Sequence, residues 1–192
     1  MRNKSQPLTA DDLATQPNNG NRYELIDGVL YVSPPPPFLH QEVVAQLAFR
    51  LNQAKPDDMA VFVAPLPVRL SSATEVAPDV LVAPVADFVR KTLPVAPALA
   101  VEVLSLSSVV TDFNAKKRTY ERYRVPSYWV IDPVEPRVVV FELDKRGKYR
   151  GGREFAGDVP FKALAPFPVR IVPSDLLSGV ARRQSSESLW AP

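Results

Sequence analysis

The apolar positions in the first third of this chain predict a β-hairpin followed by a helix. Residues 23–26 and 29–32 are two short, mostly apolar runs, and Asp27 and Gly28 between them favour the tight turn of a β-hairpin. Residues 38–54 carry Val43, Leu47 and Leu51 at helical spacing, which predicts an amphipathic helix. Four prolines at 34–37 separate the two elements, because proline cannot donate a hydrogen bond to a sheet.

The same pattern predicts further strands and helices along the rest of the chain. Residues 98–104 are almost continuously apolar, as expected of a strand buried on both faces. A helix capped by Thr111 or Asp112 follows and ends near residue 124, where Val125 and Pro126 stop it. The other expected elements are short helices at 8–13 and near Ser174, and strands at 61–70, 80–83, 128–131 and 138–143. Pro65 and Pro67 in the first of these strands indicate a bend or a sheet edge.

These elements predict one α/β (α+β) domain, whose central mixed β-sheet is flanked by helices. We expect this domain to span residues 1–180, with 181–192 as a disordered C-terminal tail. Neither a secretory signal nor an apolar run of the roughly 18 residues that a membrane span needs is found. The sequence therefore predicts a soluble, cytoplasmic protein with no membrane partner.

Composition and charge exclude several kinds of site. The 192 residues include no cysteine, which excludes a disulfide framework, a thiolate zinc site and a cysteine nucleophile. The net charge is only +2, so the whole chain carries no strong electrostatic signal for nucleic acid. Basic residues nevertheless cluster at 116–124 and again at 145–153. Each cluster is either a solvated face or part of a surface that binds phosphate.

Two acidic residues stand in apolar strands. Glu102 lies inside the run 98–104, and Asp79 precedes the strand 80–83. A buried carboxylate costs several kcal/mol unless it is paired or holds a metal. If the two strands are neighbours, these acids can meet and hold Mg²⁺ or Mn²⁺, which prefer oxygen ligands. The alternatives are a structural ion pair for Glu102 and a turn residue for Asp79.

Lys116 is the cation best placed to join these acids. Asp112, Lys116 and Tyr120 are four residues apart and share one helix face, directly after the strand that carries Glu102. A lysine there can orient the attacking water or stabilise charge that builds on a phosphate. The alternative is a surface lysine paired with Asp112, which contributes only a few tenths of a kcal/mol.

His40 and Glu24 are two further candidates. His40 is the only histidine and opens the helix 38–54, where it can face a phosphate or a water, or simply cap the helix. Glu24 lies in the first strand of the hairpin. The sequence has no glycine-rich phosphate loop and no G-x-S-x-G motif, so neither of those chemistries is supported.

Taken together, these segments resemble the Uma2 family, a restriction-endonuclease-like group of the PD-(D/E)xK nuclease superfamily. The likeness runs from about residue 22 to 143 and is carried by the segments 22–28 (RYELIDG), His40 and Gln41, 78–80 (PDV), 101–105 (VEVLS), Asp112, Lys116, Tyr120 and 125–133 (VPSYWVIDP). The resemblance implies that Asp79 is the family's PD aspartate and that Glu102 is its second acid. Leu104 occupies the usual lysine position, and the family pattern supplies Lys116 from the following helix instead.

The residues and the resemblance together predict an endonuclease that hydrolyses phosphodiester bonds of DNA with Mg²⁺ or Mn²⁺. Asp79 and Glu102 would hold the ion, Lys116 would assist the reaction, and His40 and Glu24 would position phosphate, water or a ligand. The alternative is an inactive module of the same fold that binds nucleic acid or a protein partner. A homodimer is expected, because many nuclease folds cut both strands as dimers.

Overall fold

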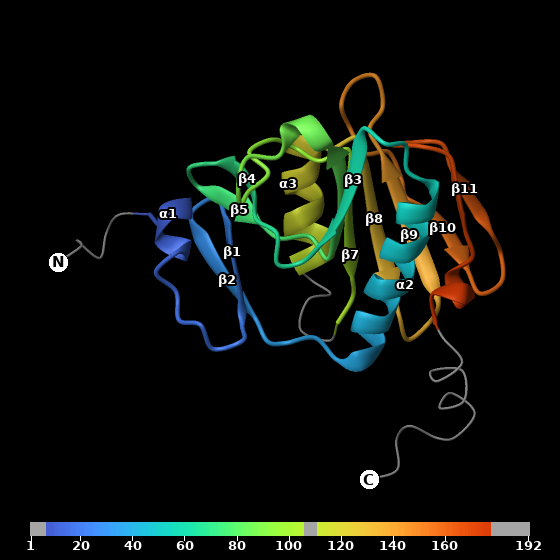
Figure 1. Ribbon diagram of the computed structural model, residues 1–192, viewed down its shortest axis with the longest axis horizontal. Coiled ribbons are helices and arrows are strands. Elements are labelled where there is room, and N and C mark those ends of the chain that lie inside the picture. The colour runs from blue at the N-terminus through green and yellow to red at the C-terminus, as the bar shows by residue number, and fades with distance from the viewer. Residues whose placement is uncertain (1–6, 106–110, 178–192) are drawn as a thin grey trace, which may run out of the picture.

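The computed structural model describes residues 7–105 and 111–177, and it shows a mixed α+β fold with few helices (Figure 1). A six-stranded mixed sheet forms its centre, beside a four-stranded sheet and a two-stranded ribbon. The expected tail at 181–192 lies outside the described residues. No helix in the described part of the chain is long and apolar enough to cross a membrane.

The central sheet confirms the strands expected around residues 80, 100, 130 and 140. Strands β7 (Leu99–Val103) and β8 (Ser127–Asp132) run parallel and are joined by a crossover that contains α3 (Lys117–Arg122), and the other pairs run antiparallel. Its strands are, in spatial order, β10 (Arg153–Ala156), β9 (Arg137–Glu142), β8 (Ser127–Asp132), β7 (Leu99–Val103), β6 (Val80–Pro84) and β3 (Met59–Val63). All five residues of β7 are buried, because the sheet is covered on both faces.

The four-stranded sheet was not expected from the sequence. Its strands are, in order, β2 (Val29–Ser33), β1 (Arg22–Ile26), β5 (Thr74–Val76) and β4 (Val68–Ser71). The β1–β2 hairpin is confirmed, with Asp27 at φ 54° and Gly28 at φ 78°, the left-handed pair that its tight turn needs. The strand expected at 61–70 is interrupted at the prolines where a bend or an edge was expected, and it is not a single strand. Pro65 and Pro67 lack the N–H that a continuous ladder needs, so the segment divides into β3 in one sheet and β4 in the other.

The helices lie on opposite faces of the central sheet. Helix α2 (Phe38–Ala54) has the expected bounds and buries Val43, Leu47 and Leu51. The helix expected from 111 to 124 begins as a π-helical turn, Thr111–Lys116, and continues as α3 (Lys117–Arg122). The remaining helical elements are α1 (Ala10–Leu13) and 3₁₀ turns at Val85–Asp87 and Pro173–Leu176, and the ribbon pairs β11 (Phe161–Ala163) with β12 (Val169–Ile171).

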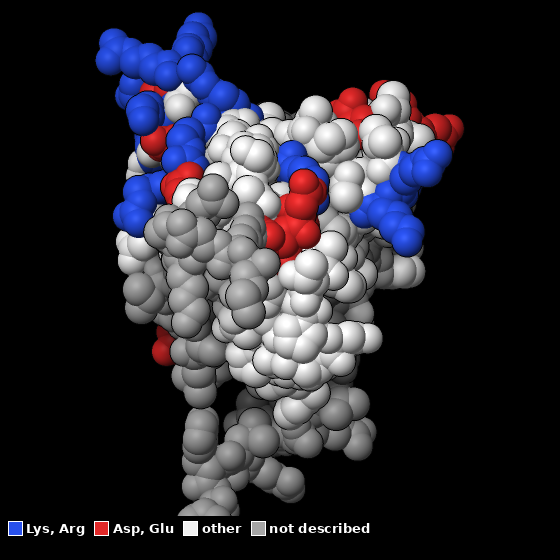
Figure 2. Space-filling view, turned by 90° about the vertical axis from the view of Figure 1, so that its left-hand side faces the viewer, with Lys and Arg blue, Asp and Glu red and all other residues white. Residues whose placement is uncertain are grey.

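Charged residues are unevenly distributed over the surface. The end of α3 and the turn at 144–150, which carry most residues of the two basic clusters, lie side by side and are linked by Lys148 Nζ and Glu121 Oε1 at 2.8 Å. Figure 2 shows Lys and Arg gathered at the upper left of one face, with few Asp and Glu among them. The two clusters therefore contribute to one surface.

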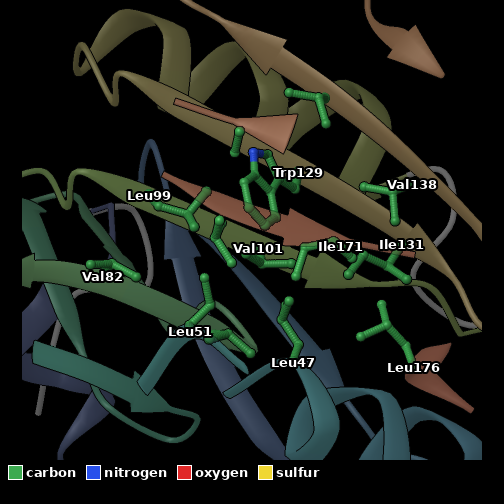
Figure 3. Close-up of a cluster of buried hydrophobic side chains, with 14 of the residues drawn as sticks. Leu47, Leu51, Val82, Leu99, Val101, Trp129, Ile131, Val138, Ile171 and Leu176 are labelled. Atoms are coloured by element: carbon green, nitrogen blue, oxygen red, sulfur yellow. The ribbon is translucent and has the colours of Figure 1, made fainter. Parts of the chain in front are cut away.

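The two faces of the central sheet have different interiors. On the face covered by α2, Leu47 and Leu51 pack with Val101, Trp129 and other apolar side chains of alternate strand positions (Figure 3). On the opposite face, Leu81, Ala100 and Val130 pack with Tyr120 of α3. Burial of each large apolar side chain contributes about 1.5–3 kcal/mol. Glu102 alternates with the α2-facing valines of β7 and thus belongs to the α3 side.

Candidate active site

Strands β6 and β7 bring the two strand acids together. Val80 is paired with Val101, and one step further in this antiparallel register places Asp79 opposite Glu102. The backbone N–H of Val103 donates to Asp79 Oδ2 at 2.8 Å, which fixes the carboxylate against β7. Asp79 and Glu102 are almost wholly buried, with 1% and 0% exposure. The condition on which the acids could meet, that their strands are neighbours in the sheet, is confirmed.

Asp79 is held by two nitrogen-bearing side chains from other elements. Arg22 Nη1, from β1, donates to Asp79 Oδ1 at 2.5 Å, and His40 Nε2, from the first turn of α2, lies 3.0 Å from Oδ2. Burial alone raises the pKa of Asp79, but the His40 hydrogen bond and the charges of Arg22, His40 and Lys116 outweigh it and hold the pKa well below its usual range. Asp79 is therefore ionised at neutral pH, and its expected alternative as a simple turn residue is wrong.

Glu102 is held by the face of the helix that crosses β7. Lys116 Nζ lies 2.9 Å from Glu102 Oε2, and the Tyr120 hydroxyl donates to Oε1 at 2.7 Å. Burial and the charge of Glu102 raise the pKa of Tyr120 well above its usual range, so the phenol keeps its proton and remains a donor. Lys116 is only 2% exposed, so the alternative of a surface lysine is wrong. The predicted helical phase of Lys116 and Tyr120 is confirmed, and Lys117 lies over the Phe141 ring instead.

Glu24 links the two carboxylates through their cations. Its Oε2 lies 3.0 Å from Lys116 Nζ and 3.5 Å from Arg22 Nε, and its Oε1 accepts the backbone N–H of Ala77 at 2.7 Å. The network thus holds three carboxylates and two permanent cations, with His40 at its edge. Counted by their formal charges, these three carboxylates and two permanent cations sum to −1.

A cleft of about 640 Å³ opens beside this network. Arg22, His40 and Asp79 are its ionisable lining residues, and Ser105 is one of several uncharged polar residues among the rest of the described lining. Glu102, Lys116 and Glu24 do not line the cleft but lie behind Asp79, in contact with it through the network. The five predicted residues therefore form one connected cluster, of which only His40 and Asp79 face the opening.

His40 is buried in the wall rather than being an exposed cap. Pro37 occupies the N-cap position of α2, and the His40 side chain instead contacts Asp79. The other ring nitrogen, Nδ1, is buried without a hydrogen-bond partner among the described residues, as is Arg22 Nε. Buried polar atoms are rarely left unsatisfied, and such exceptions often mark a functional position. Both orphaned atoms belong to residues that line the cleft.

The donor set suits a hard divalent cation that keeps part of its water shell. No three His, Cys, Asp or Glu side chains in the described part of the chain form a ready ligand group. Mg²⁺ does not need one, because proteins commonly bind it through one or two carboxylates, with waters and substrate phosphates completing the shell. Asp79 and Glu102 provide such a pair, on the condition that Arg22 releases Asp79 Oδ1.

Two residues of the network were missed as site residues in the sequence. Arg22 and Glu24 are two apart in β1, so the alternation of a strand places them on one face, and that signal identifies Arg22 once Glu24 is a candidate. Tyr120 follows Lys116 by one helical turn, and that spacing predicted the shared face but not the contact with Glu102. The contacts of Arg22 with Asp79 and of Tyr120 with Glu102 join elements that are distant in the sequence, so they are visible only in the folded structure.

Comparison with known proteins agrees with this fold. The model of the Uma2 family, described as "Putative restriction endonuclease", matches residues 10–169. A crystal structure described as "a putative nuclease belonging to DUF820", from Anabaena variabilis, is similar with a TM-score of 0.71 and 21% identity, over 88% of this chain and 97% of that chain. This likeness establishes the fold. No curated protein matches the chain.

Proposed function

This chain belongs to the Uma2 family, and we propose that it is a divalent-metal-dependent endonuclease that hydrolyses phosphodiester bonds of DNA. The observation that carries the proposal is the pair of buried acids, Asp79 and Glu102, on neighbouring strands, of which Asp79 lines the cleft and Glu102 lies behind it. A fold gains no stability from two carboxylates placed there, because apolar residues of the same volume would stabilise the sheet more.

Asp79 and Glu102 would hold Mg²⁺ or Mn²⁺, and the ion would supply positive charge that stabilises the phosphate as negative charge builds on it. Asp79 supplies an ionised carboxylate at neutral pH, since its pKa is held low. Tyr120 and Lys116 fix both oxygens of Glu102, so this carboxylate cannot rotate freely. The two ligands are thereby oriented before any ion arrives.

The cations and His40 would act on the substrate and on the acids. Arg22 lines the cleft, so on leaving Asp79 Oδ1 it would donate to a phosphate oxygen, an acceptor that guanidinium binds well. His40, oriented by Asp79, would position a water or a phosphate oxygen at the cleft wall. Lys116 would orient Glu102 and Glu24 and add positive charge beside the attacking water.

The test is cleavage of supercoiled and linear DNA by the purified protein with Mg²⁺ or Mn²⁺. We expect cutting by the wild type, a loss of at least about 100-fold in Glu102→Gln, typical of removing one essential electrostatic contact, and an unchanged rate in Glu75→Gln. Glu75 is a matched control because it is also buried and ion-paired, with Arg69, outside the network. Equal cutting by Glu102→Gln and the wild type would refute the assignment. Light scattering of the same samples tests the proposed homodimer.

A second candidate function is a binding module without catalysis. The observation that favours it is that Arg22, His40, Lys116 and Tyr120 together contact every oxygen of Asp79 and Glu102, so the network is complete without a metal ion. Calorimetric titration with Mn²⁺ separates the two. Nucleic-acid binding together with no heat of metal binding would support the module and contradict the endonuclease.

A further inference from the structure

The end of α3 and the turn at 144–150 form a surface rich in cations, which we call the basic surface. All of its cations are exposed, and it consists of Arg118, Arg122, Arg124, Lys145, Arg146, Lys148 and Arg150. Three acids lie among them, Asp27, Glu121 and Asp144, which leaves a balance of +4. Because the whole chain carries only +2, the positive charge is concentrated here, as Figure 2 shows at its upper left.

The acids of this surface hold its two segments together. Glu121 accepts from Lys148 Nζ at 2.8 Å and from the backbone N–H of Tyr149 at 2.7 Å, so it joins α3 to the turn. The Tyr149 hydroxyl donates to the carbonyl of Val125 at 2.7 Å. Asp144 accepts the backbone N–H groups of Arg146 and Lys148 and thereby shapes the turn. The cations are thus displayed on a fixed scaffold.

Arg124 is an independent sign that the surface is selected for its side chains. It has φ 61°, a left-handed conformation that Gly or Asn adopts with less strain at a helix end. Its guanidinium lies against Gly147, where an added Cβ would be 1.8 Å from Nη1. Gly147 itself has φ 72°, so its turn favours glycine independently of Arg124. The fold accepts strain at Arg124, and this places one more cation on the surface.

The basic surface is connected to the cleft by strand β1. Arg22 at one end of β1 lines the cleft, and Asp27 just beyond its other end pairs with Arg122 at 2.6 and 3.0 Å. At about 3.3 Å per residue, the separation is roughly 15 Å. This is the length of four or five nucleotide steps of a duplex strand, at about 3.4 Å each. The described cleft wall itself offers only Arg22 as a permanent cation.

We propose that the basic surface binds the phosphodiester backbone of duplex nucleic acid four or five base pairs from the bond that enters the cleft. The position of the cut relative to this surface rests on the proposed function, whereas the binding of nucleic acid by the surface does not. Phosphate contacts by Lys and Arg provide affinity without reading sequence, and their strength falls with salt. The cleft would then select the scissile bond while this surface holds the flanking strand.

Anisotropy of a fluorescent 20-base-pair duplex in EDTA, over a series of salt concentrations, tests the proposal. The test variant replaces Arg118, Lys145 and Arg146 with Ser, since these three make no ion pair with another residue of the described ranges. The control replaces Arg90, Lys91 and Lys162 with Ser, which removes the same charge at exposed positions elsewhere. Because each phosphate contact contributes about 0.9 to the slope of log K against log salt, we expect the slope to become shallower by about 2–3 in the test variant.

The control should keep the wild-type slope and stay within about threefold of its affinity. Equal losses of duplex affinity in the test and control variants would overturn the inference, and so would an unchanged salt slope in the test variant. Binding of phosphatidylserine vesicles in place of the duplex would also overturn it. Because EDTA prevents metal-dependent cleavage, the outcome does not depend on catalysis. If the wild type binds the duplex through this surface but cuts no DNA with Mn²⁺, only the proposed function is refuted. If the wild type cuts DNA but the test variant binds the duplex as the wild type does, only the inference is refuted.

Discussion

The two faces of strand β7 differ although their residues alternate along the same five positions. The side chains of Val101 and Val103 face α2 and belong to the apolar cluster around Leu47. Glu102 between them faces α3 and is held by Lys116 and Tyr120. The α2 face follows the ordinary logic of a core, in which apolar burial stabilises the fold. The α3 face places ionised groups where desolvation offsets much of their attraction, so its composition is better explained by chemistry than by stability.

Lys116→Met should produce the largest effect, because it leaves Glu24 and Glu102 buried without their cation. We expect a loss of about 3–5 kcal/mol in the free energy of unfolding, measured by urea denaturation. Adding Glu102→Gln to this variant should recover more than about 1 kcal/mol, since the unpaired charge is removed. Simple additivity of the two substitutions would show that the α3 face behaves like an ordinary core.

Leu47→Ala tests the opposite face and should cost about 2–5 kcal/mol, because it leaves a cavity beneath the sheet. Unlike Lys116→Met, it should leave the affinity for Mn²⁺ unchanged at temperatures where the protein remains folded, since α2 contacts the acids through His40 rather than Leu47. Calorimetry at 15 °C checks this, with circular dichroism to verify the folded state. A change in affinity as large as that of a network variant would remove the distinction between the faces.

Arg22→Gln should have opposite effects on the metal-free and metal-bound protein. Without metal, Asp79 loses its guanidinium and the melting temperature should fall. With Mn²⁺, the affinity should rise roughly tenfold, because a charged hydrogen bond of about 1.5 kcal/mol no longer competes for Asp79 Oδ1. The control Arg122→Gln removes the same charge from an exposed pair with Asp27 and should change the affinity less than twofold, on the scale of a surface salt bridge.

The smallest expected effect is the contribution of Asp79 to the pH dependence of the free energy of unfolding. The pKa of Asp79 is lower in the folded protein than in the unfolded chain, where it is about 3.8. Its contribution is therefore complete above about pH 4–5 and is lost as the pH falls below that value toward the folded pKa. Between pH 5 and 2, the free energy of unfolding should decline less steeply in Asp79→Asn than in the wild type. Identical slopes would mean that Asp79 is not held ionised by its neighbours.

Local signals in the sequence predicted much of the fold. Asp27 and Gly28 specify the hairpin, the apolar stripe of α2 specifies that helix, and the apolar run interrupted only by Glu102 identifies β7. The division of residues 61–70 between two sheets was missed because strand pairing is decided by distant partners, β6 for β3 and β5 for β4. Strand β5 was missed because it is only three residues long and carries the buried Glu75.

A residue of the candidate site could be predicted only where it is unusual for its local sequence context. Glu102 and Asp79 are charges in apolar strands, and Lys116 shares the phase of Tyr120. Arg22 has no such feature, because an arginine at the start of a strand is common. Only the packing of the four-stranded sheet beside β6 brings it to Asp79. The metal, the substrate and the role of each residue remain predictions.

The proline segment at 34–37 has a consequence for what the cleft can admit. Three of these prolines line the opening, and the fourth begins α2, so the link between the hairpin and His40 has four backbone angles that cannot turn freely. An entrance with so little backbone freedom keeps its width whether it is empty or filled. We therefore expect this side of the cleft to keep a constant width. It should exclude ligands that are too large to enter and should not close around a bound ligand.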